Sequence, residues 1–180
     1  TPVISGVYQA ATALNGSNTV VLTVNVTTVG TYTVSTGTNN GISFSGTGQI
    51  QFGMSPKDVA EAIGAPLRIR QNGANRRETR AIDLPIIRYV EEQVSEIEFF
   101  RDIEQLLFRG ILLFREPGQA VMRRLSELNG GAEETVGIVL FRNLGLTTGR
   151  LDEGVTGEHS VTAFAKGLWD HDTSFKPIRF

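Results

Sequence analysis

The chain has 180 residues, of which 40% are apolar and 20% charged, with a net charge of −2 and no cysteine. This apolar fraction supports a buried core and argues against disorder of the whole chain. The small net charge gives no overall field that would attract nucleic acid, and the lack of cysteine excludes disulfides, thiolate metal sites and a cysteine nucleophile.

The charges lie in one part of the chain only. Asp, Glu, Lys, Arg and His are all absent before Lys57, whereas the 56 residues of this stretch would carry about 14 charges at average composition. The sequence therefore predicts two parts. Residues 1–48 are expected to form an uncharged β module rich in Thr, Ser, Gly and Val, and residues 49–180 a mixed-charge α+β domain. The abrupt change after Gly48 also fits an artificial fusion of two unrelated pieces.

Alternating apolar and hydroxyl side chains predict strands in the first part. In Thr19–Val26 the valines and the leucine lie mainly on one face, with threonine and asparagine on the other. Asn and Gly tolerate positive φ and predict a turn at Gly37–Gly41. The strands expected in this part are Val3–Ala10, Thr19–Val26, Thr31–Thr36 and Ile42–Ser45.

Residues 18–48 have the sequence NTVVLTVNVTTVGTYTVSTGTNNGISFSGTG, which resembles the extracellular β-sandwich repeats of Bacteroidetes-type surface proteins. The resemblance covers about residues 3–48 and implies a small, incomplete all-β sandwich. In that family further strands follow, whereas Gln49 begins a different kind of sequence. The open edge is then covered by the second part or offered to another chain. We expect pairing with another chain.

A helix start is well marked at the beginning of the second part. Ser55 suits the N-cap, Pro56 the first helical position and Asp58 the position that returns a capping bond. Gly64 and Pro66 then predict the end of this helix.

A second helix is expected from about Pro117 to Leu128, ending at Asn129–Gly131. Near Phe99 and Phe100 the alternation is imperfect, which predicts either a β-bulge or burial on both faces there. The strands expected in the second part are Ile50–Phe52, Leu67–Arg70, Ile86–Val90, Val94–Phe100, Leu106–Phe114, Gly137–Phe141 and Ser160–Lys166.

A weak internal repeat predicts a duplicated arrangement of elements in the second part. An offset of 62 residues aligns Phe52 with Phe114 and Val59 with Val121. In each copy an apolar strand turns through proline into a short amphipathic helix, and strands follow. We therefore expect two strand–helix–strands units around one antiparallel sheet.

Five blocks of the second part resemble the small bacterial immunity proteins that are encoded beside polymorphic toxins. Their order and spacing match over about residues 49–170, and they read IQFGMSPKDVAEAIGAP, DLPIIRYVEEQVSEIEFF, FRGILLFREPGQAVMRRL, VLFRNLGL and HSVTAFAKGLWD. In that family these residues are mostly structural and variable surfaces set partner specificity. The resemblance therefore implies no catalytic residue. An uncharged segment of extracellular type ahead of the domain departs from the family.

Motifs for catalysis and cofactor binding are absent from the sequence. It contains no Gly-x-Ser-x-Gly elbow, no Walker A sequence and no Gly-x-Gly-x-x-Gly. His159 and His171 lie on different expected elements and have no cysteine nearby, so we expect no metal site. These observations predict a protein that is not an enzyme and needs no cofactor.

Charged clusters are the candidate binding residues. Glu91 and Glu92 begin an acidic cluster that either imitates phosphate for a basic toxin or forms a solvated hairpin. Asp170, His171 and Asp172 form a second candidate patch for a protein partner.

Two further features are weaker candidates for binding. Arg76, Arg77 and Arg80 are expected to form a basic loop without interleaved aromatic residues, so nucleic-acid binding has no support. The single tryptophan, Trp169, suits a core or rim position better than a binding anchor.

The function that these observations favour is binding, in which the chain sequesters a cognate toxin as an immunity-type protein. The alternative is a structural surface or secreted protein that assembles through an open β edge. The first implies a cytoplasmic protein and the second an extracellular or cell-surface one. No apolar run reaches the roughly 18 residues of a membrane span, so none is expected.

Overall fold

The computed structural model describes residues 21–25, 31–35, 41–44, 48–103, 106–154 and 156–180. The fold is mostly β, with a nine-stranded antiparallel sheet, a six-stranded sheet and two α-helices. The strand expected at Val3–Ala10 lies outside the described residues.

The six-stranded sheet combines segments from both parts of the chain. Its strand order is β10-β9-β1-β2-β3-β4 and every pairing is antiparallel. Its strands are β1 (Val21–Asn25), β2 (Thr31–Ser35), β3 (Gly41–Phe44), β4 (Gly48–Gln51), β9 (Leu106–Phe108) and β10 (Ile111–Leu112).

The nine-stranded sheet has the order β15-β11-β12-β13-β14-β8-β7-β6-β5. Strands β8 and β14 pair in its interior, with Glu98 opposite Thr162. The strands are β5 (Arg68–Asn72), β6 (Asn75–Thr79), β7 (Ile86–Val90), β8 (Gln93–Phe100), β11 (Ala132–Thr135), β12 (Ile138–Phe141), β13 (Leu146–Gly149), β14 (Ser160–Phe164) and β15 (Lys176–Ile178).

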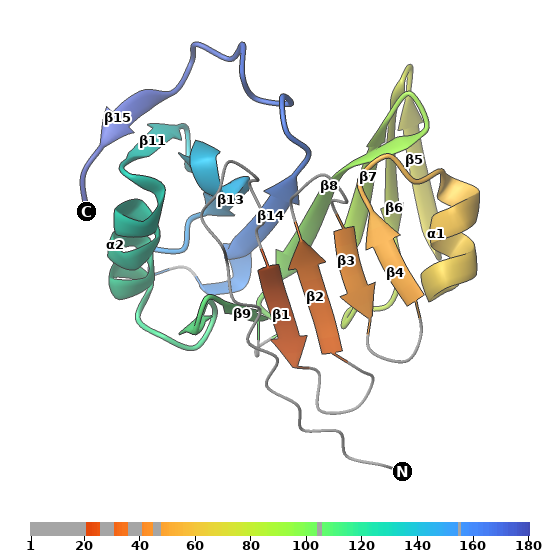
Figure 1. Ribbon diagram of the computed structural model, residues 1–180, viewed down its shortest axis with the longest axis horizontal. Coiled ribbons are helices and arrows are strands. Elements are labelled where there is room, and N and C mark those ends of the chain that lie inside the picture. Colours follow the sequence, from red (N-terminus) through yellow and green to blue (C-terminus); the bar gives the residue numbers. More distant parts are fainter. Residues whose placement is uncertain (1–20, 26–30, 36–40, 45–47, 104–105, 155) are drawn as a thin grey trace.

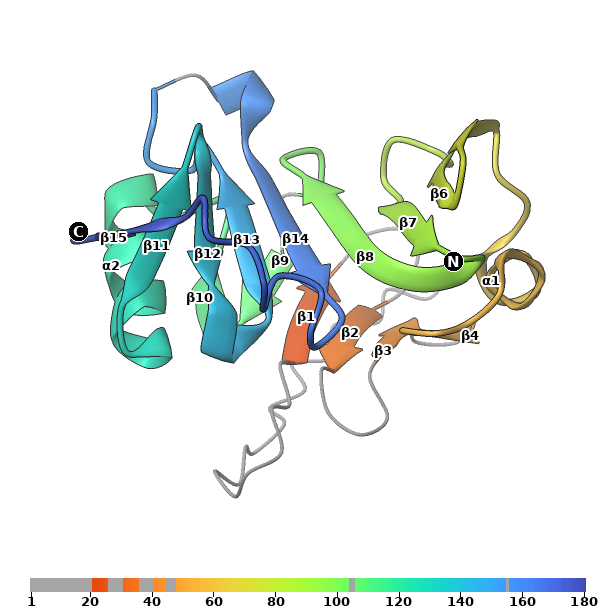
Figure 2. The ribbon, with the colours of Figure 1, turned by 90° about the horizontal axis from the view of Figure 1, so that it is seen from above.

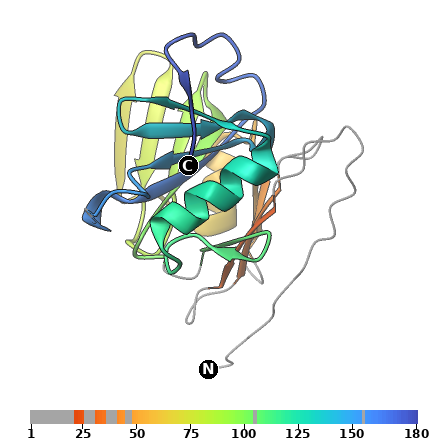
Figure 3. The same cartoon turned by 90° about the vertical axis from the view of Figure 1, so that its left-hand side faces the viewer.

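One hydrophobic core lies between the inner face of the nine-stranded sheet and a second layer made of the six-stranded sheet and the helices. Figure 1 shows α1 and α2 at opposite ends of the molecule, and Figure 2 shows β1–β4 as a layer apart from β6–β8 and β14. Figure 3 shows α2 in front of the large sheet, with β1–β4 nearly edge-on. Fully buried side chains come from both layers, and they include Ile50, Val59, Ile97, Phe99, Phe108, Leu125 and Val161.

The first helix forms as its sequence predicts. Helix α1 spans Pro56–Ile63, and Ser55 and Asp58 make the reciprocal hydrogen bonds of a capping box. Gly64 ends the helix with φ +90°, a conformation that favours glycine. Burial of Val59 fixes the helix on the core.

The second helix, α2, spans Gly118–Asn129 and ends at Gly130 in the left-handed conformation, as expected. Its buried residues Val121, Met122 and Leu125 recur at helical spacing. A Cβ on Gly118 would meet the carbonyl oxygen of Leu151 at 1.7 Å, so only glycine fits at the start of this helix. This close approach holds the helix against the segment after β13.

Two predictions for the second part are wrong. The expected basic loop around Arg76 and Arg77 is strand β6. The single strand expected at Leu106–Phe114 is the short hairpin β9–β10, which turns through Arg109 and Gly110, both at positive φ. Sequence patterns also missed β11, β13 and β15, which are short or carry polar residues.

The expected β-bulge is present on β8 but at a different residue. Arg88 pairs with Glu96 and Tyr89 with Val94, so Ser95 is the extra residue. Near Phe99 the pairing with β14 is regular. At the bulge, the Ser95 carbonyl accepts a hydrogen bond from the Ala165 N–H at 2.8 Å.

The edge of the first segment is occupied within the chain. Strand β1 pairs with β2 on one side and with β9 on the other, with Thr23 opposite Leu107. Strand β4 spans the composition boundary, since it runs from Gly48 to Gln51. Strand β9 of the second part thus covers the β1 side, whereas β4 ends the sheet on the other side within the described residues, and pairing with another chain stays a prediction. Whether residues 1–48 and 49–180 fold as separate units remains a prediction.

We expect a chain that lacks residues 1–47 to unfold at a lower temperature than the full chain. Strands β1–β3 fill the space between β9 and β4, both of which contribute fully buried residues to the core. Exposure of even two such side chains costs about 3–6 kcal/mol, a large part of a typical domain stability of about 5–15 kcal/mol. Thermal unfolding followed by circular dichroism measures the difference. Equal midpoints would mean that the first segment adds nothing to the core.

Candidate functional site

The outer face of the nine-stranded sheet is divided into a covered and an open half. Over β11–β14 the segment after β14 packs on the sheet, where Phe164, Phe175 and Leu140 are buried together with part of Trp169. The Trp169 ring meets Phe164 and Phe175 edge-on. The sequence prediction that Trp169 is a core or rim residue is confirmed. Over β5–β8 the outer face carries charged and amide side chains.

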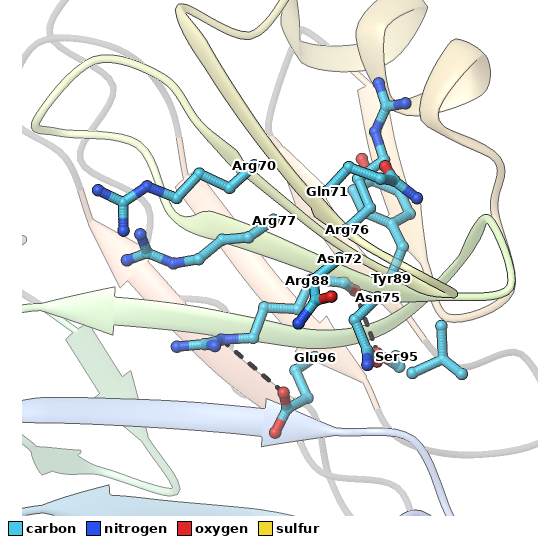
Figure 4. Close-up of a pocket in the computed structure, with 11 residues that line it drawn as sticks. Arg70, Gln71, Asn72, Asn75, Arg76, Arg77, Arg88, Tyr89, Ser95 and Glu96 are labelled. Atoms are coloured by element: carbon cyan, nitrogen blue, oxygen red, sulfur yellow. Dashed lines mark hydrogen bonds and ion pairs between the residues drawn. The ribbon is translucent and has the colours of Figure 1, made fainter.

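Three arginines lie side by side on the open half. Arg70 is directly opposite Arg77, Arg77 is opposite Arg88, and Arg88 is opposite Glu96, on four neighbouring strands. We call Arg70, Arg77 and Arg88 the arginine row. Figure 4 shows their guanidinium groups extending side by side, with Glu96 next to Arg88. Like charges directly opposite one another destabilise a sheet, so this arrangement needs anions nearby.

The acids of the open half gather at one end of the arginine row. Arg88 is 2.8 Å from Glu98 and 3.8 Å from Glu96. Arg77 is 3.9 Å from Glu98, at the limit of an ion pair. Burial raises the pKa of Glu96; Arg88 opposes this rise and Glu98 adds to it. Arg70 has no ion pair within the described residues, so positive charge is left at the β5 end of the row.

The electrostatics of Arg77 reflect this crowding. Burial lowers the pKa of Arg77, Glu98 opposes the shift, and the neighbouring Arg88 and Arg70 lower the pKa further. Its Nε is buried and has no hydrogen-bond partner among the described residues. The guanidinium group therefore has a donor to spare in a place that water hardly reaches.

The turn between β7 and β8 has an unusual sequence. Its two central residues, Glu91 and Glu92, have φ +50° and +57°, which is the pattern of a type I′ turn. That turn is normally made by Asn-Gly, because positive φ costs a side-chain-bearing residue about 1–2 kcal/mol. Both glutamates are exposed. The backbone thus presents two carboxylates at the tip of a strained hairpin.

Neighbouring groups hold this turn in place. The Glu91 N–H donates to the Ala74 carbonyl at 2.9 Å, which joins the tip to the β5–β6 turn. Glu92 accepts a hydrogen bond from Gln71 at 3.4 Å and lies 3.5 Å from Arg76. The Glu91 carboxylate has no ion-pair partner within the described residues and faces solvent.

A buried charge network supports the same strands from the inner face. The Glu78 carboxylate is fully buried and accepts hydrogen bonds from Arg76 at 2.7 Å, Arg80 at 2.8 Å and the Tyr89 hydroxyl at 2.7 Å. Arg80 also donates to the Gly64 carbonyl at the end of α1. Arg76 and Arg80 are therefore structural here, while Arg77 points to the opposite face. The network fixes β6 and β7 under the arginine row.

The balance of forces at Glu78 favours the ionised form. Burial acts to raise the pKa of Glu78, but the hydrogen bonds from Tyr89, Arg76 and Arg80 together hold it below its ordinary value. Conversely, burial and the bond to Glu78 raise the pKa of Tyr89. The hydroxyl therefore stays protonated and donates.

The second predicted patch lies on the segment that covers the other half of the sheet. Asp170 and His171 are exposed, and Asp172 is half-buried. Hydrogen bonds from Ser174 lower the pKa of Asp172. No contact within the described residues joins this patch to Glu91 and Glu92, so the structure leaves the two predicted surfaces apart.

The two histidines occupy different settings. His171 is exposed, whereas His159 is buried with its Nε2 2.9 Å from the Glu153 carbonyl and its Nδ1 3.5 Å from Arg101. Among the described residues, no group of three or more His, Cys, Asp or Glu side chains is arranged to hold a metal ion.

The arginine row is the feature that sequence reasoning missed. Its members are separated in sequence by 7 positions (Arg70 to Arg77) and 11 positions (Arg77 to Arg88). No local pattern in the sequence indicates the strand register that aligns them. The signal that could have found them is the pair of tight turns, Gly73-Ala74 and Glu91-Glu92, because two-residue turns fix the register of their hairpins.

Comparisons of this chain with protein-family models, with characterised proteins and with solved structures found no match. Among the described residues, no helix is both long and apolar enough to cross a membrane.

Replacement of Glu91-Glu92 by Asn-Gly should raise the free energy of unfolding by at least about 1 kcal/mol. The change relieves two residues of unfavourable positive φ, at about 1–2 kcal/mol each, and loses an exposed ion pair worth at most about 1 kcal/mol. Urea unfolding measures the effect. The matched control is Gln-Gln at the same positions, which removes the charges, keeps the strain and should give no such gain. A less stable Asn-Gly variant would contradict the type I′ assignment.

Stability should fall on acidification through the protonation of Glu78. The folded pKa of Glu78 lies below its unfolded value of about 4.3. Its contribution is therefore fully present above that value and is lost as the pH falls through the folded pKa. In urea unfolding from pH 7 to pH 3, Tyr89→Phe should lose stability at a higher pH than the native chain, since one bond to the carboxylate is gone. Glu127→Gln, at an exposed residue of α2, should follow the native curve. Identical curves for all three chains would contradict the role of Glu78.

Proposed function

We propose that this chain is a non-catalytic protein-binding protein of the immunity type, which sequesters a cognate bacterial toxin. The five sequence blocks within residues 49–170 support this proposal through their resemblance to immunity proteins. The observation that carries it is the exposed Glu91-Glu92 turn, which the protein keeps at a cost in conformational energy.

The cost of this turn argues for a role of its side chains. Where only the fold matters, Asn-Gly would make the same turn with less strain. Residues held in unfavourable backbone conformations cluster at functional sites, where the surrounding structure supports them. We therefore assign the two carboxylates to contact with a partner.

The surroundings of the turn suit recognition of a basic protein surface. Glu92 is oriented by Gln71 and Arg76, while Glu91 is free to accept a new ion pair. The buried network around Glu78 holds the strands beneath, so little order is lost on binding. Carboxylates at the tip of a rigid hairpin would steer association with a toxin of opposite charge.

A second surface for contact with the toxin is proposed at Asp170, His171 and Asp172. These residues lie on the segment between β14 and β15, and the first two of them are exposed. A toxin large enough to reach both segments would contact a polar rim around the open half of the sheet.

We also infer that the two halves of residues 49–180 share a duplicated plan. Strand β4, helix α1 and strands β5–β8 occur in the same order as β10, α2 and β11–β14. The last strands of the two units, β8 and β14, pair antiparallel in the middle of the large sheet. That placement suits an approximate twofold relation between the units, as the 62-residue offset in sequence predicts.

Charge reversal at the turn should slow the binding of the toxin encoded at the same locus. We expect Glu91→Lys with Glu92→Lys to lower the association rate at low salt by about tenfold or more, because rim charges act mainly on association. Surface plasmon resonance at two salt concentrations measures this. Asp170→Lys with Asp172→Lys tests the second surface in the same way.

The matched control is Glu127→Lys with Glu134→Lys, which makes the same change in net charge at two exposed residues of α2 and β11. It should leave the rate within about twofold. Equal rates for all variants would remove both predicted surfaces. Absence of binding by the native chain would count against the immunity-type function itself.

A further inference from the structure

We propose that Arg70 and Arg77 bind one doubly charged oxyanion of the phosphate-monoester class on the outer face of the nine-stranded sheet. This site contains neither Glu91 nor Glu92 and goes beyond toxin sequestration. It would exist whether or not the chain binds a toxin.

The first argument is an unbalanced charge on one sheet face. Four arginines and two glutamates lie on the outer face of β5–β8, and both acids lie beside Arg88. Arg70 has no ion pair within the described residues and Arg77 has only the 3.9 Å contact with Glu98. Directly opposite residues on neighbouring strands have their Cβ atoms about 4.5–5.5 Å apart, and like charges on such a pair destabilise the sheet. The outer-face charges are Arg68, Arg70, Arg77, Arg88, Glu96 and Glu98.

The second argument is a set of unused donors. The Arg77 Nε is buried without a partner among the described residues, which is costly unless an acceptor reaches it. Burial is the main cause of the lowered pKa of Arg77, and the charge of Arg70 lowers this pKa further. An anion placed between Arg70 and Arg77 would therefore reduce their charge repulsion. Arginine offers a planar fork of donors that matches the oxygens of phosphate.

The third argument is the shape of the surface. The arginine row lines a pocket of about 250 Å³, which also takes in Asn72, Asn75 and Ser95 and, at its Arg88 end, the carboxylate of Glu96. This volume is below the roughly 300–1,000 Å³ of sites for drug-sized ligands, so it suits a small group. The side-chain amides of Asn72 and Asn75 have no hydrogen bond within the described residues. Figure 4 shows them near the stem of Arg88, while the guanidinium groups of Arg70 and Arg77 extend away from them.

Charge and donor number together favour phosphate over a carboxylate. A carboxylate matches one arginine fork and neutralises one charge. A phosphate monoester carries about −1.5 to −2 charge near pH 7 and three acceptor oxygens. It can therefore span two neighbouring guanidinium groups and neutralise both.

Titration of the ¹⁵N-labelled full chain with inorganic phosphate at constant ionic strength tests the site. We expect the arginine Nε–Hε signals of Arg70 and Arg77 to shift saturably in the NMR spectrum. Arg70→Gln should weaken phosphate binding by about tenfold or more, the loss expected for one charge-assisted partner. Arg77→Gln is the second variant. The control is Arg123→Gln, which removes the same charge from an exposed residue of α2 and should change the affinity by less than about twofold.

Acetate under the same conditions distinguishes the two classes of anion and should bind at least about tenfold more weakly than phosphate. Three outcomes would each overturn the proposal. These are the lack of a saturable shift, equal weakening by Arg70→Gln and Arg123→Gln, and acetate binding as tight as phosphate binding. None of these measurements uses a toxin, so a failure here leaves the immunity-type function standing, and the reverse also holds.

Discussion

The antiparallel pairing of β8 with β14 is the interaction on which the rest of the structure depends. It joins strands that follow α1 to strands that follow α2, and so makes one nine-stranded sheet with one inner face. Phe99 and Val161, opposite each other in this pair, are both fully buried. Because side chains alternate along a strand, the register that buries these two also places Glu98 and Thr162 on the outer face. The core and the outer face are therefore set by the same pairing.

The two halves of the outer face differ because the segment after β14 covers only one of them. The chain leaves β14 beside the Ser95 bulge and covers β11–β14 with Trp169 and Phe175, while β5–β8 stay open. The Glu78 network on the inner face lets the open strands carry several charges without loosening. A buried carboxylate with three donors is well satisfied, and loss of one donor would leave the Glu78 charge less fully compensated in the core. The open half is thus a supported surface, which suits a binding role.

The sequence predicts local structure well where a local mechanism acts. The capping box at Ser55 and the glycine ends of both helices follow from hydrogen bonds within one turn, and they are correct. Strand β8 follows from alternation of buried residues, whereas β7 and β14 follow from short apolar runs that are buried partly or wholly on both faces. The short polar strand β6 is harder to predict because its sequence, NRRET, lacks an apolar face, whereas the strand expected at Leu67–Arg70 overlaps β5. The candidate site is predictable only at its rim, at Glu91 and Glu92, because the arginine row exists only once four strands are in register.

Strand β5 has a further consequence for how the protein behaves in solution. It is an edge strand of the nine-stranded sheet and is exposed along its whole length. It carries Arg68 and Arg70. Charges on an exposed strand keep it from pairing with another chain. Arg70 would then both bind an anion and help to prevent self-association of the protein. An anion seated on Arg70 would cancel part of the repulsion that keeps two β5 strands apart, so the tendency of the protein to associate would be linked to the anions dissolved around it.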